Sequence, residues 1–201
     1  MAESVAPLTA DPADCSAAVA IIGSAGGIPA AMQLLSRLSL GFPFPIIIAQ
    51  HLAPSAPSNL PQVLGRHTRL QIKWARDGET PRAGLVYVVP VGCQLALRDG
   101  RFAVSPLAPC SASWLALPDL LLLSLACCYG ARAIGIVLSG MAAAGVMGIR
   151  EIRRLGGTTM AQNERSSRFF DMPRAAIDLG KVDIVLPPDR IAAALNVLAA
   201  L

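Results

Sequence analysis

A serine in a glycine-rich turn and a histidine further along the chain are the residues whose types and placement favour chemistry. Ser24 follows the apolar run 18–23 and precedes the small-residue turn 25–27, and His51 follows a second apolar run, 44–50. A serine hydroxyl is a weak nucleophile until a positioned imidazole takes its proton. Because the carboxyl ends of parallel strands gather in one crevice, Ser24 and His51 are candidates for nucleophile and general base.

The glycine-rich turn also admits other interpretations. Such a turn after a first strand occurs in nucleotide-binding proteins and as plain structure. The stretch 23–27 lacks the G-x-G-x-x-G spacing, and no acid suited to a ribose is found, which disfavours a dinucleotide site. The stretch also differs from the G-x-S-x-G turn of α/β-hydrolases. A catalytic serine and a purely structural turn therefore both stay open from these residues alone.

Two further stretches are candidates for serving such a site. The small-residue turn 140–145 opens a helix, so its backbone N–H groups could stabilise an oxyanion or only permit tight packing. The polar loop 162–174 could clamp a polar substrate or be a hydrated loop. His67, the other histidine, lies among arginines and is interpreted as a surface group. With 2 histidines and no carboxylate cluster, we expect no metal site and no cofactor.

Alternating strand and helix patterns must position these residues. Strands are expected at 18–23, 44–50, 70–73, 85–90, 133–138, 158–161 and 182–186, and several of them are the continuous Val/Ile runs of a parallel sheet buried on both faces. Helices are expected at 28–38, 58–66, 117–128, from the turn 140–145 to about 155, from residue 172, and at 189–201. Arg98, Asp99 and Gly100 predict an antiparallel hairpin between 94–97 and 101–104.

Composition limits the classes of protein that this chain can represent. At 201 residues, with 54% apolar and 15% charged residues, one globular domain is the simplest expectation. The formal charge of +4 is mild and the basic residues are dispersed, which disfavours nucleic-acid binding. Residues 1–17 lack the pattern of a secretory signal and are expected to form a loose tail. The apolar window 114–128 is too short to span a bilayer, and 5 cysteines fit free thiols in a reducing cytoplasm.

Six short stretches occur in an order that is specific as a set. They are IGSAGG at 22–27, AQHLAP at 49–54, DGE at 77–79, LSGM at 138–141, AQNE at 161–164 and MPRAAI at 172–177. Together they resemble the catalytic domain of CheB-type chemotaxis receptor methylesterases, over about 18–198. The resemblance implies a doubly wound, mainly parallel α/β sheet with helices on both faces and a small antiparallel hairpin. It also implies hydrolysis of γ-glutamyl methyl esters, often with glutamine deamidation.

The resemblance assigns roles to individual residues. Ser24 falls on the nucleophile, His51 on the general base and Met141 on a residue whose backbone N–H lines the oxyanion hole, with the Ala25 amide as a second donor. The expected partners are methylated receptor signalling helices or a related signalling protein, and neither membrane insertion nor an oligomeric state is predicted. The domain is expected over residues 18–201, without the receiver domain of full-length relatives.

Two departures from the family pattern affect the expected activity. Ala144 stands where the family has the aspartate that orients the histidine, and 115–117 replaces an Arg-Pro-Ser segment. In a well-studied serine protease, changing the corresponding aspartate to asparagine lowers kcat by roughly 10⁴, or about 5 kcal/mol of barrier. The sequence therefore predicts an attenuated esterase, with Asp171 or Asp119 as possible substitute acids. The alternative is a catalytically inactive CheB-like domain that binds a receptor or signalling partner.

Overall fold

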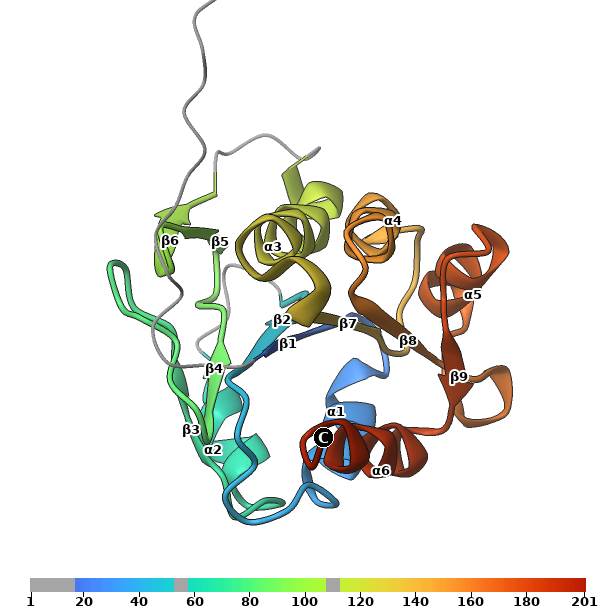
Figure 1. Ribbon diagram of the computed structural model, residues 1–201, viewed down its shortest axis with the longest axis horizontal. Helices are drawn as coiled ribbons and strands as arrows, with labels where there is room; N and C mark the ends of the chain where they lie inside the picture. Colours follow the sequence, from blue (N-terminus) through green and yellow to red (C-terminus); the bar gives the residue numbers. More distant parts are fainter. Residues whose placement is uncertain (1–16, 53–57, 108–112) are drawn as a thin grey trace, which may run out of the picture.

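The centre of the molecule is a sheet of 7 parallel strands in the order β3-β4-β2-β1-β7-β8-β9 (Figure 1). A computed structural model describes residues 17–52, 58–107 and 113–201 of the chain. The strands are β1 (Ala18–Gly23), β2 (Ile46–Gln50), β3 (Gln71–Trp74), β4 (Leu85–Val88), β7 (Ala133–Val137), β8 (Thr158–Gln162) and β9 (Ile184–Leu186). From β1 the chain forms β2, then the edge strand β3 and then β4 between them, and it returns to the centre to build the other half outward from β7. The gap between β1 and β7 is therefore a topological switch point, where such sheets bind ligands.

Helices cover both faces of the sheet. α3 (Ser113–Tyr129), α4 (Val146–Arg154) and α5 (Asp171–Asp178) lie on one face, and α1 (Gly27–Leu35), α2 (Leu60–Gly65) and α6 (Pro188–Leu198) lie on the other (Figure 1). In β1, Ala20 and Ile22 belong to the apolar cluster of the first face, whereas Val19 and Ile21 belong to that of the second. Because successive strand residues point to opposite faces, a continuous apolar run is what this two-sided burial requires.

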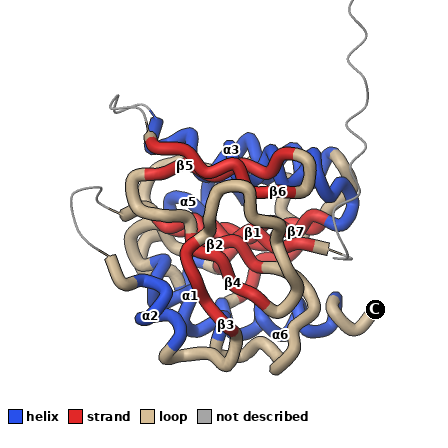
Figure 2. Tube along the Cα trace, turned by 90° about the vertical axis from the view of Figure 1, so that its left-hand side faces the viewer, coloured by secondary structure: helices blue, strands red, loops and turns tan. Residues whose placement is uncertain are grey.

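The predicted hairpin is present outside the central sheet. β5 (Cys93–Arg98) pairs antiparallel with β6 (Arg101–Pro106), and the pair lies beside α3 (Figure 2). Asp99 and Gly100 both have positive φ, 49° and 71°, as a two-residue hairpin turn requires. The backbone N–H of Leu97 donates to the Ser124 hydroxyl of α3 at 3.0 Å. The doubly wound, mainly parallel fold with a small hairpin is confirmed, and each predicted strand and helix is present, with ends shifted by a few residues.

The largest shift in an element boundary is at the start of α3. The sequence predicts a helix over 117–128, but the helix begins at Ser113 and continues through Pro118. Pro118 is the sixth residue of α3 and therefore lies inside the helix, where the ring removes one intrahelical hydrogen bond that an N–H at this position would donate. Among the helices that the structure describes, none combines the length and apolar character needed to cross a membrane.

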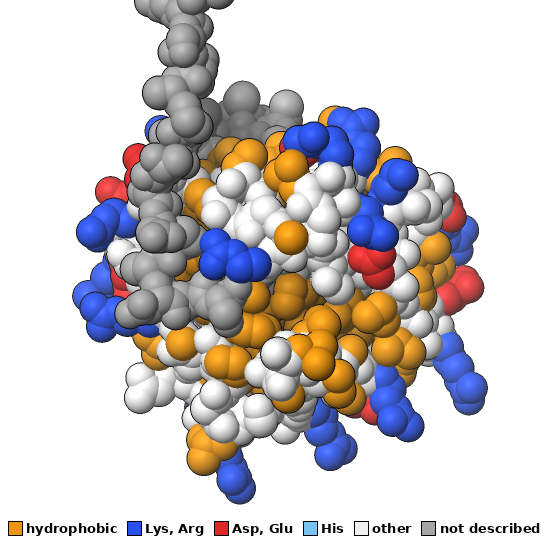
Figure 3. All heavy atoms as spheres, in the orientation of Figure 1, with side chains coloured by type: hydrophobic (Ala, Val, Ile, Leu, Met, Phe, Trp, Pro, Cys, Tyr) orange, Lys and Arg blue, Asp and Glu red, His pale blue; other side chains and the backbone are white. Residues whose placement is uncertain are grey.

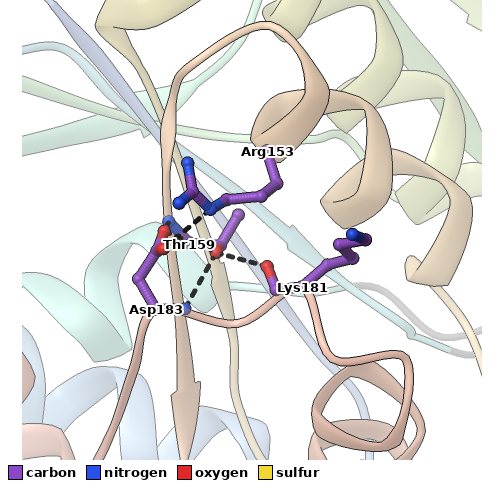
Figure 4. Close-up of polar contacts among 4 residues, drawn as sticks. All are labelled: Arg153, Thr159, Lys181 and Asp183. Carbon is purple, nitrogen blue, oxygen red and sulfur yellow. Dashed lines mark hydrogen bonds and ion pairs between the residues drawn. The ribbon is translucent and has the colours of Figure 1, made fainter.

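The β8–β9 edge of the sheet is fixed by a buried hydroxyl and an ion pair (Figure 4). Thr159 is fully buried and its hydroxyl donates to the Lys181 carbonyl at 2.6 Å, while the Asp183 amide donates to that hydroxyl at 3.1 Å. Arg153 of α4 pairs with the Asp183 carboxylate at 2.8 Å. These contacts join α4 to the edge strand. On the face in Figure 3, Lys and Arg side chains are dispersed around the rim rather than gathered in one stripe.

Candidate active site

Ser24 and His51 lie next to each other because β1 and β2 are neighbours in register. Gly23 pairs with Gln50, so the two strands end at the same level of the sheet. The backbone N–H of His51 then donates to the Gly23 carbonyl at 3.1 Å, which extends the ladder by one residue. The expectation that Ser24 and His51 follow neighbouring strand ends is confirmed. Both residues are half-buried.

The turn after β1 is fixed by hydrogen bonds to both backbone groups of Ser24. Its N–H donates to the Ser139 carbonyl at 3.0 Å, and its carbonyl accepts from Gly27 N at 2.9 Å and from Gln50 Nε2 at 2.7 Å. Gly26 has a φ of +79°, and a Cβ on it would lie 2.5 Å from Ser139 Oγ. Only glycine fits there, so the glycine pattern of the sequence has a steric reason.

A second turn, after β7, packs directly against Ser24. A Cβ placed on Gly140 would lie 2.1 Å from the Met172 sulfur and 3.0 Å from Ser24 Cβ. The Gly140 N–H donates to the Phe169 carbonyl at 3.1 Å, and the Gly140 carbonyl accepts from Met172 N at 3.0 Å. The polar loop and α5 therefore hold Gly140 against the serine, which brings Met141 to the same turn. The Met141 side chain is 53% exposed.

Backbone amides near Ser24 differ in whether they already donate a hydrogen bond within the protein. The Ser24 amide itself is bonded to the Ser139 carbonyl. The amides of Ala25 and Met141 donate to no other residue in the part of the chain that the structure describes. Donors aimed at the place where negative charge develops must be available when substrate binds. The two amides predicted for the oxyanion hole meet this requirement.

Ala144 is fully buried and belongs to the apolar cluster that includes Ile22 and Leu122. A carboxylate at this position would be removed from bulk water, where it needs a charged or hydrogen-bonding partner. Alanine needs none. The departure from the family pattern at Ala144 is therefore accommodated by apolar packing.

The two proposed substitute acids lie at the starts of different helices. The carboxylate of Asp119 accepts from Gly145 N at 3.3 Å and from Gly148 N at 2.7 Å, so it caps the amino end of α4. Asp171 is exposed in the first turn of α5, where a negative charge is favourable. These positions give both acids a structural function, and a contact of either with His51 stays a prediction.

The polar loop and His67 lie mostly at the surface. The guanidinium of Arg174 is 3.4 Å from the Glu164 carboxylate and 5.3 Å from the centre of the Phe170 ring. Arg168 lies 5.7 Å from the ring centre of Phe169. Exposed pairs of this kind contribute little to stability. His67 follows α2 and is exposed, in agreement with its interpretation as a surface group.

Three polar side chains at strand ends support the site, and reasoning from residue types alone gave them no role. Gln50 ends β2 and holds the Ser24 carbonyl. Gln162 ends β8, and its Oε1 accepts from the Ser139 amide at 2.8 Å while its Nε2 donates to the Ser166 carbonyl at 2.8 Å. The Ser139 hydroxyl contacts the Ala25 and Phe169 carbonyls at 2.9 and 3.1 Å. The sequence did contain one signal for these three residues, which is a polar residue at the carboxyl end of each buried apolar run.

The fold and this site together define a doubly wound α/β protein with a serine at its switch point and a histidine on the adjacent strand end. The CheB methylesterase family model matches residues 19–195. The chain therefore belongs to the CheB methylesterase family.

Individual relatives agree with this assignment. The chain is 39% identical over 181 residues to protein-glutamate methylesterase/protein-glutamine glutaminase 2 of Anaeromyxobacter dehalogenans, covering 90% of this chain and 53% of that protein. It is 38% identical over 178 residues to protein-glutamate methylesterase FrzG of Myxococcus xanthus, covering 88% and 53%. The crystal structure of the Thermotoga maritima CheB methylesterase catalytic domain has a TM-score of 0.81 at 28% identity, covering 90% of this chain and 98% of that one. The chain spans about half the length of these curated relatives.

Proposed function

We propose that residues 18–201 hydrolyse γ-glutamyl methyl esters on the signalling helices of chemotaxis-type receptors, with glutamine deamidation as a second reaction. The observation that carries the proposal is the pairing of Gly23 with Gln50, because it ends β1 and β2 at the same level and so makes Ser24 and His51 follow neighbouring strand ends. Membership of the CheB methylesterase family and the names of the relatives support the choice of substrate. A substrate on receptor signalling helices implies a cytoplasmic location.

The proposed mechanism is acyl transfer through Ser24. His51 takes the Ser24 proton as Oγ attacks the ester carbonyl carbon, and the amides of Ala25 and Met141 hold the resulting oxyanion. The imidazolium returns the proton to the departing methoxide, which leaves as methanol. A water activated by His51 then attacks the acyl-enzyme and releases the glutamate side chain and free Ser24. With glutamine as substrate the leaving group is ammonia.

We propose that this activity is attenuated because Ala144 occupies the position of the orienting aspartate. His51 then lacks a carboxylate at that position to fix its tautomer and to balance the imidazolium charge. Asp171 and Asp119 are the acids in the chain that we propose as substitutes. The rate is expected to depend on Asp171 more than on Asp119, since the Asp119 carboxylate already caps α4.

The complete burial of Ala144 favours one alternative, a CheB-like domain that binds a receptor or signalling partner without catalysis. An apolar residue packed where the family has an acid is what loss of selection for catalysis would leave. Ser24 and His51 are retained, which favours the esterase. The two functions differ in whether methanol is formed.

Methanol release from methylated receptor separates these functions. We expect the protein to release methanol slowly, the Ser24→Ala variant to release none above background, and the Ser36→Ala variant to match the unchanged protein. Ser36 is an exposed residue at the end of α1, so its replacement controls for loss of a serine hydroxyl elsewhere. A rate equal to that of Ser24→Ala, together with binding of receptor, would establish the non-catalytic alternative.

A further inference from the structure

A cleft of about 450 Å³, including space open to solvent, has His51 in its lining, whereas the serine turn at 24–27 does not line it. One wall is formed by the end of β2 and by Leu52, another by Leu117, Pro118 and Leu121 at the start of α3. A third wall is formed by the start of β5 with the residues before it and by the residue that follows β6. Its residues are Val91, Gly92, Cys93, Gln94, Leu95 and Leu107. Most of the side chains that line this cleft are apolar.

The position of the cleft indicates what occupies it. During acyl transfer the ester carbonyl must lie within reach of both Ser24 and His51. Substrate groups next to the esterified side chain, on the His51 side, are then directed into the cleft. We propose that the cleft is a specificity subsite that takes an apolar side chain of the substrate segment flanking the methylated glutamate. The proposal rests on the proposed esterase function and adds a determinant of substrate choice to it.

The hairpin wall of this subsite is held by the turn 77–79. Asp77 Oδ1 accepts from the Val104 amide at 2.9 Å. The Gly78 amide donates to the Phe102 carbonyl at 2.8 Å, and the Phe102 amide donates to the Glu79 carbonyl at 2.8 Å. The turn therefore acts as a short third strand beside β6. Since β6 pairs with β5 along its full length, the turn sets the position of Cys93 and Leu95 in the cleft.

Asp77 is accordingly a positioning residue for substrate binding. It belongs to the DGE stretch at 77–79, which the proposed catalytic mechanism does not use. Its carboxylate joins the hairpin to the loop after β3, and Asp77 itself is not one of the described residues that line the cleft. Loss of this bond should loosen the hairpin wall and leave the Ser24 turn unchanged.

The first test narrows the cleft. Cys93 is half-buried in it, whereas Cys127 is exposed on α3 and does not line it, so Cys93→Phe and Cys127→Phe are a matched pair. With methylated receptor as substrate, we expect Cys93→Phe to raise KM about 10-fold or more at unchanged kcat, since one misfitted apolar group changes binding by this order. Cys127→Phe should leave both constants unchanged. Cys93→Leu, a smaller change, serves if the phenylalanine variant does not fold.

The second test loosens the hairpin. Asp77→Ala should raise KM several-fold at unchanged kcat and should speed hydrogen exchange of the Val104 amide. Asp77→Asn keeps a carbonyl acceptor at the same place and should restore both values. If Asp77 only stabilised the fold, Asp77→Ala would lower kcat and stability together instead of raising KM at unchanged kcat.

The outcomes separate the inference from the proposed function. If the unchanged protein releases methanol and Cys93→Phe has the same KM as Cys127→Phe, the subsite is wrong and the esterase stands. If Asp77→Ala exchanges faster at Val104 with an unchanged KM, the hairpin wall does not contact substrate. If the unchanged protein releases no methanol, the proposed function and the subsite are overturned together.

Discussion

At the scale of single residues, the position of Ser24 depends on a network of hydrogen bonds to which three polar side chains contribute. Gln50, Ser139 and Gln162 all lie at the carboxyl ends of strands, and Ser139 and Gln162 are buried. Buried polar groups are costly unless they are hydrogen-bonded, so each can adopt few orientations here. This network fixes the two turns that meet at Ser24. A catalytic group needs such preorganisation because small displacements of reacting atoms lower the rate strongly.

The Gln50→Met variant tests that dependence. Methionine keeps a side chain of similar length but removes the Nε2 donor that binds the Ser24 carbonyl. We expect kcat for methanol release to fall by up to about 10² because the turn shifts. Stability to urea should fall by only about 1 kcal/mol, since the carbonyl keeps its bond from Gly27. Gln33→Met, at an exposed position of α1, is the control; an equal fall in kcat there would show that Gln50 does not position the turn.

Ala144→Asp tests whether the missing acid limits the rate. If the new carboxylate reaches His51, kcat should rise by about 10² to 10⁴, the range associated with a triad aspartate. If it finds no partner, the buried charge should lower the free energy of unfolding by on the order of 3 kcal/mol or more. The steady-state rate of methanol release at saturating substrate measures the change in kcat, and urea denaturation measures the change in stability.

The matched control for that variant is Ala144→Asn, which has a similar size without the charge. It should not raise kcat, because an amide does not balance the imidazolium. A stable Ala144→Asp protein with an unchanged kcat would mean that the site differs from an active one in more than this residue.

At the scale of elements, α4 begins at the site and depends on a side chain from α3. Gly145, with a φ of +84°, precedes the helix, and its first turn has no acidic residue of its own. Asp119 supplies the negative charge from α3 by accepting from Gly145 and Gly148. The contact joins the two helices next to Ala144. Asp119 is therefore placed to influence the site through the position of α4.

We expect Asp119→Ala to lower the free energy of unfolding by about 0.5–2 kcal/mol, the usual effect of losing a helix cap. Asp119→Asn should lose less, since an amide oxygen also caps. The exposed Asp178→Ala, at the end of α5, is the control and should change little. Urea denaturation gives the comparison, and equal stability of Asp119→Ala and Asp178→Ala would show that the cap contributes nothing.

At the scale of the whole molecule, the elements were predictable from the sequence where burial leaves a continuous apolar run. The apolar run at 18–23 predicted β1 correctly because both faces of this strand are buried. Asp99 and Gly100 predicted the hairpin correctly because residues of these types readily adopt the positive φ that its turn requires. The predicted start of α3 was wrong because Pro118 indicates a helix boundary, whereas the helix begins at Ser113 and continues through Pro118. The doubly wound arrangement of the sheet followed from the family resemblance rather than from periodicity, and the order of the strands was not predicted.

The candidate site was predictable only in part, for a physical reason. The adjacency of Ser24 and His51 follows from the general rule that parallel strand ends share one edge. The functions of Gln162 and Asp119 depend on bonds to residues far away in sequence, Ser139 and Gly148, and no local pattern identifies the partners in such bonds.

The thiol of Cys128 contributes to the contact between the hairpin and α3, so the stability of the protein depends on the protonation of this thiol. Cys128 of α3 donates to the Leu97 carbonyl of β5 at 3.7 Å, and burial raises the pKa of the Cys128 thiol above its ordinary value of 9.0. A raised pKa in the folded state means that this contribution to stability is fully present below pH 9.0. It is then lost as the pH rises through the higher value.

The unfolding free energy should therefore fall with pH above 9.0 more steeply in the unchanged protein than in Cys128→Ala, where no thiol ionises at this position. Cys127→Ala, which removes the exposed neighbouring thiol, should keep the steep dependence. Urea denaturation at a series of alkaline pH values measures the slopes. Parallel slopes for Cys128→Ala and the unchanged protein would contradict a desolvated thiol at the contact between α3 and β5. A flatter slope for Cys128→Ala alone would show that ionisation of this thiol destabilises the fold at high pH, at the contact of α3 with the hairpin that lines the cleft.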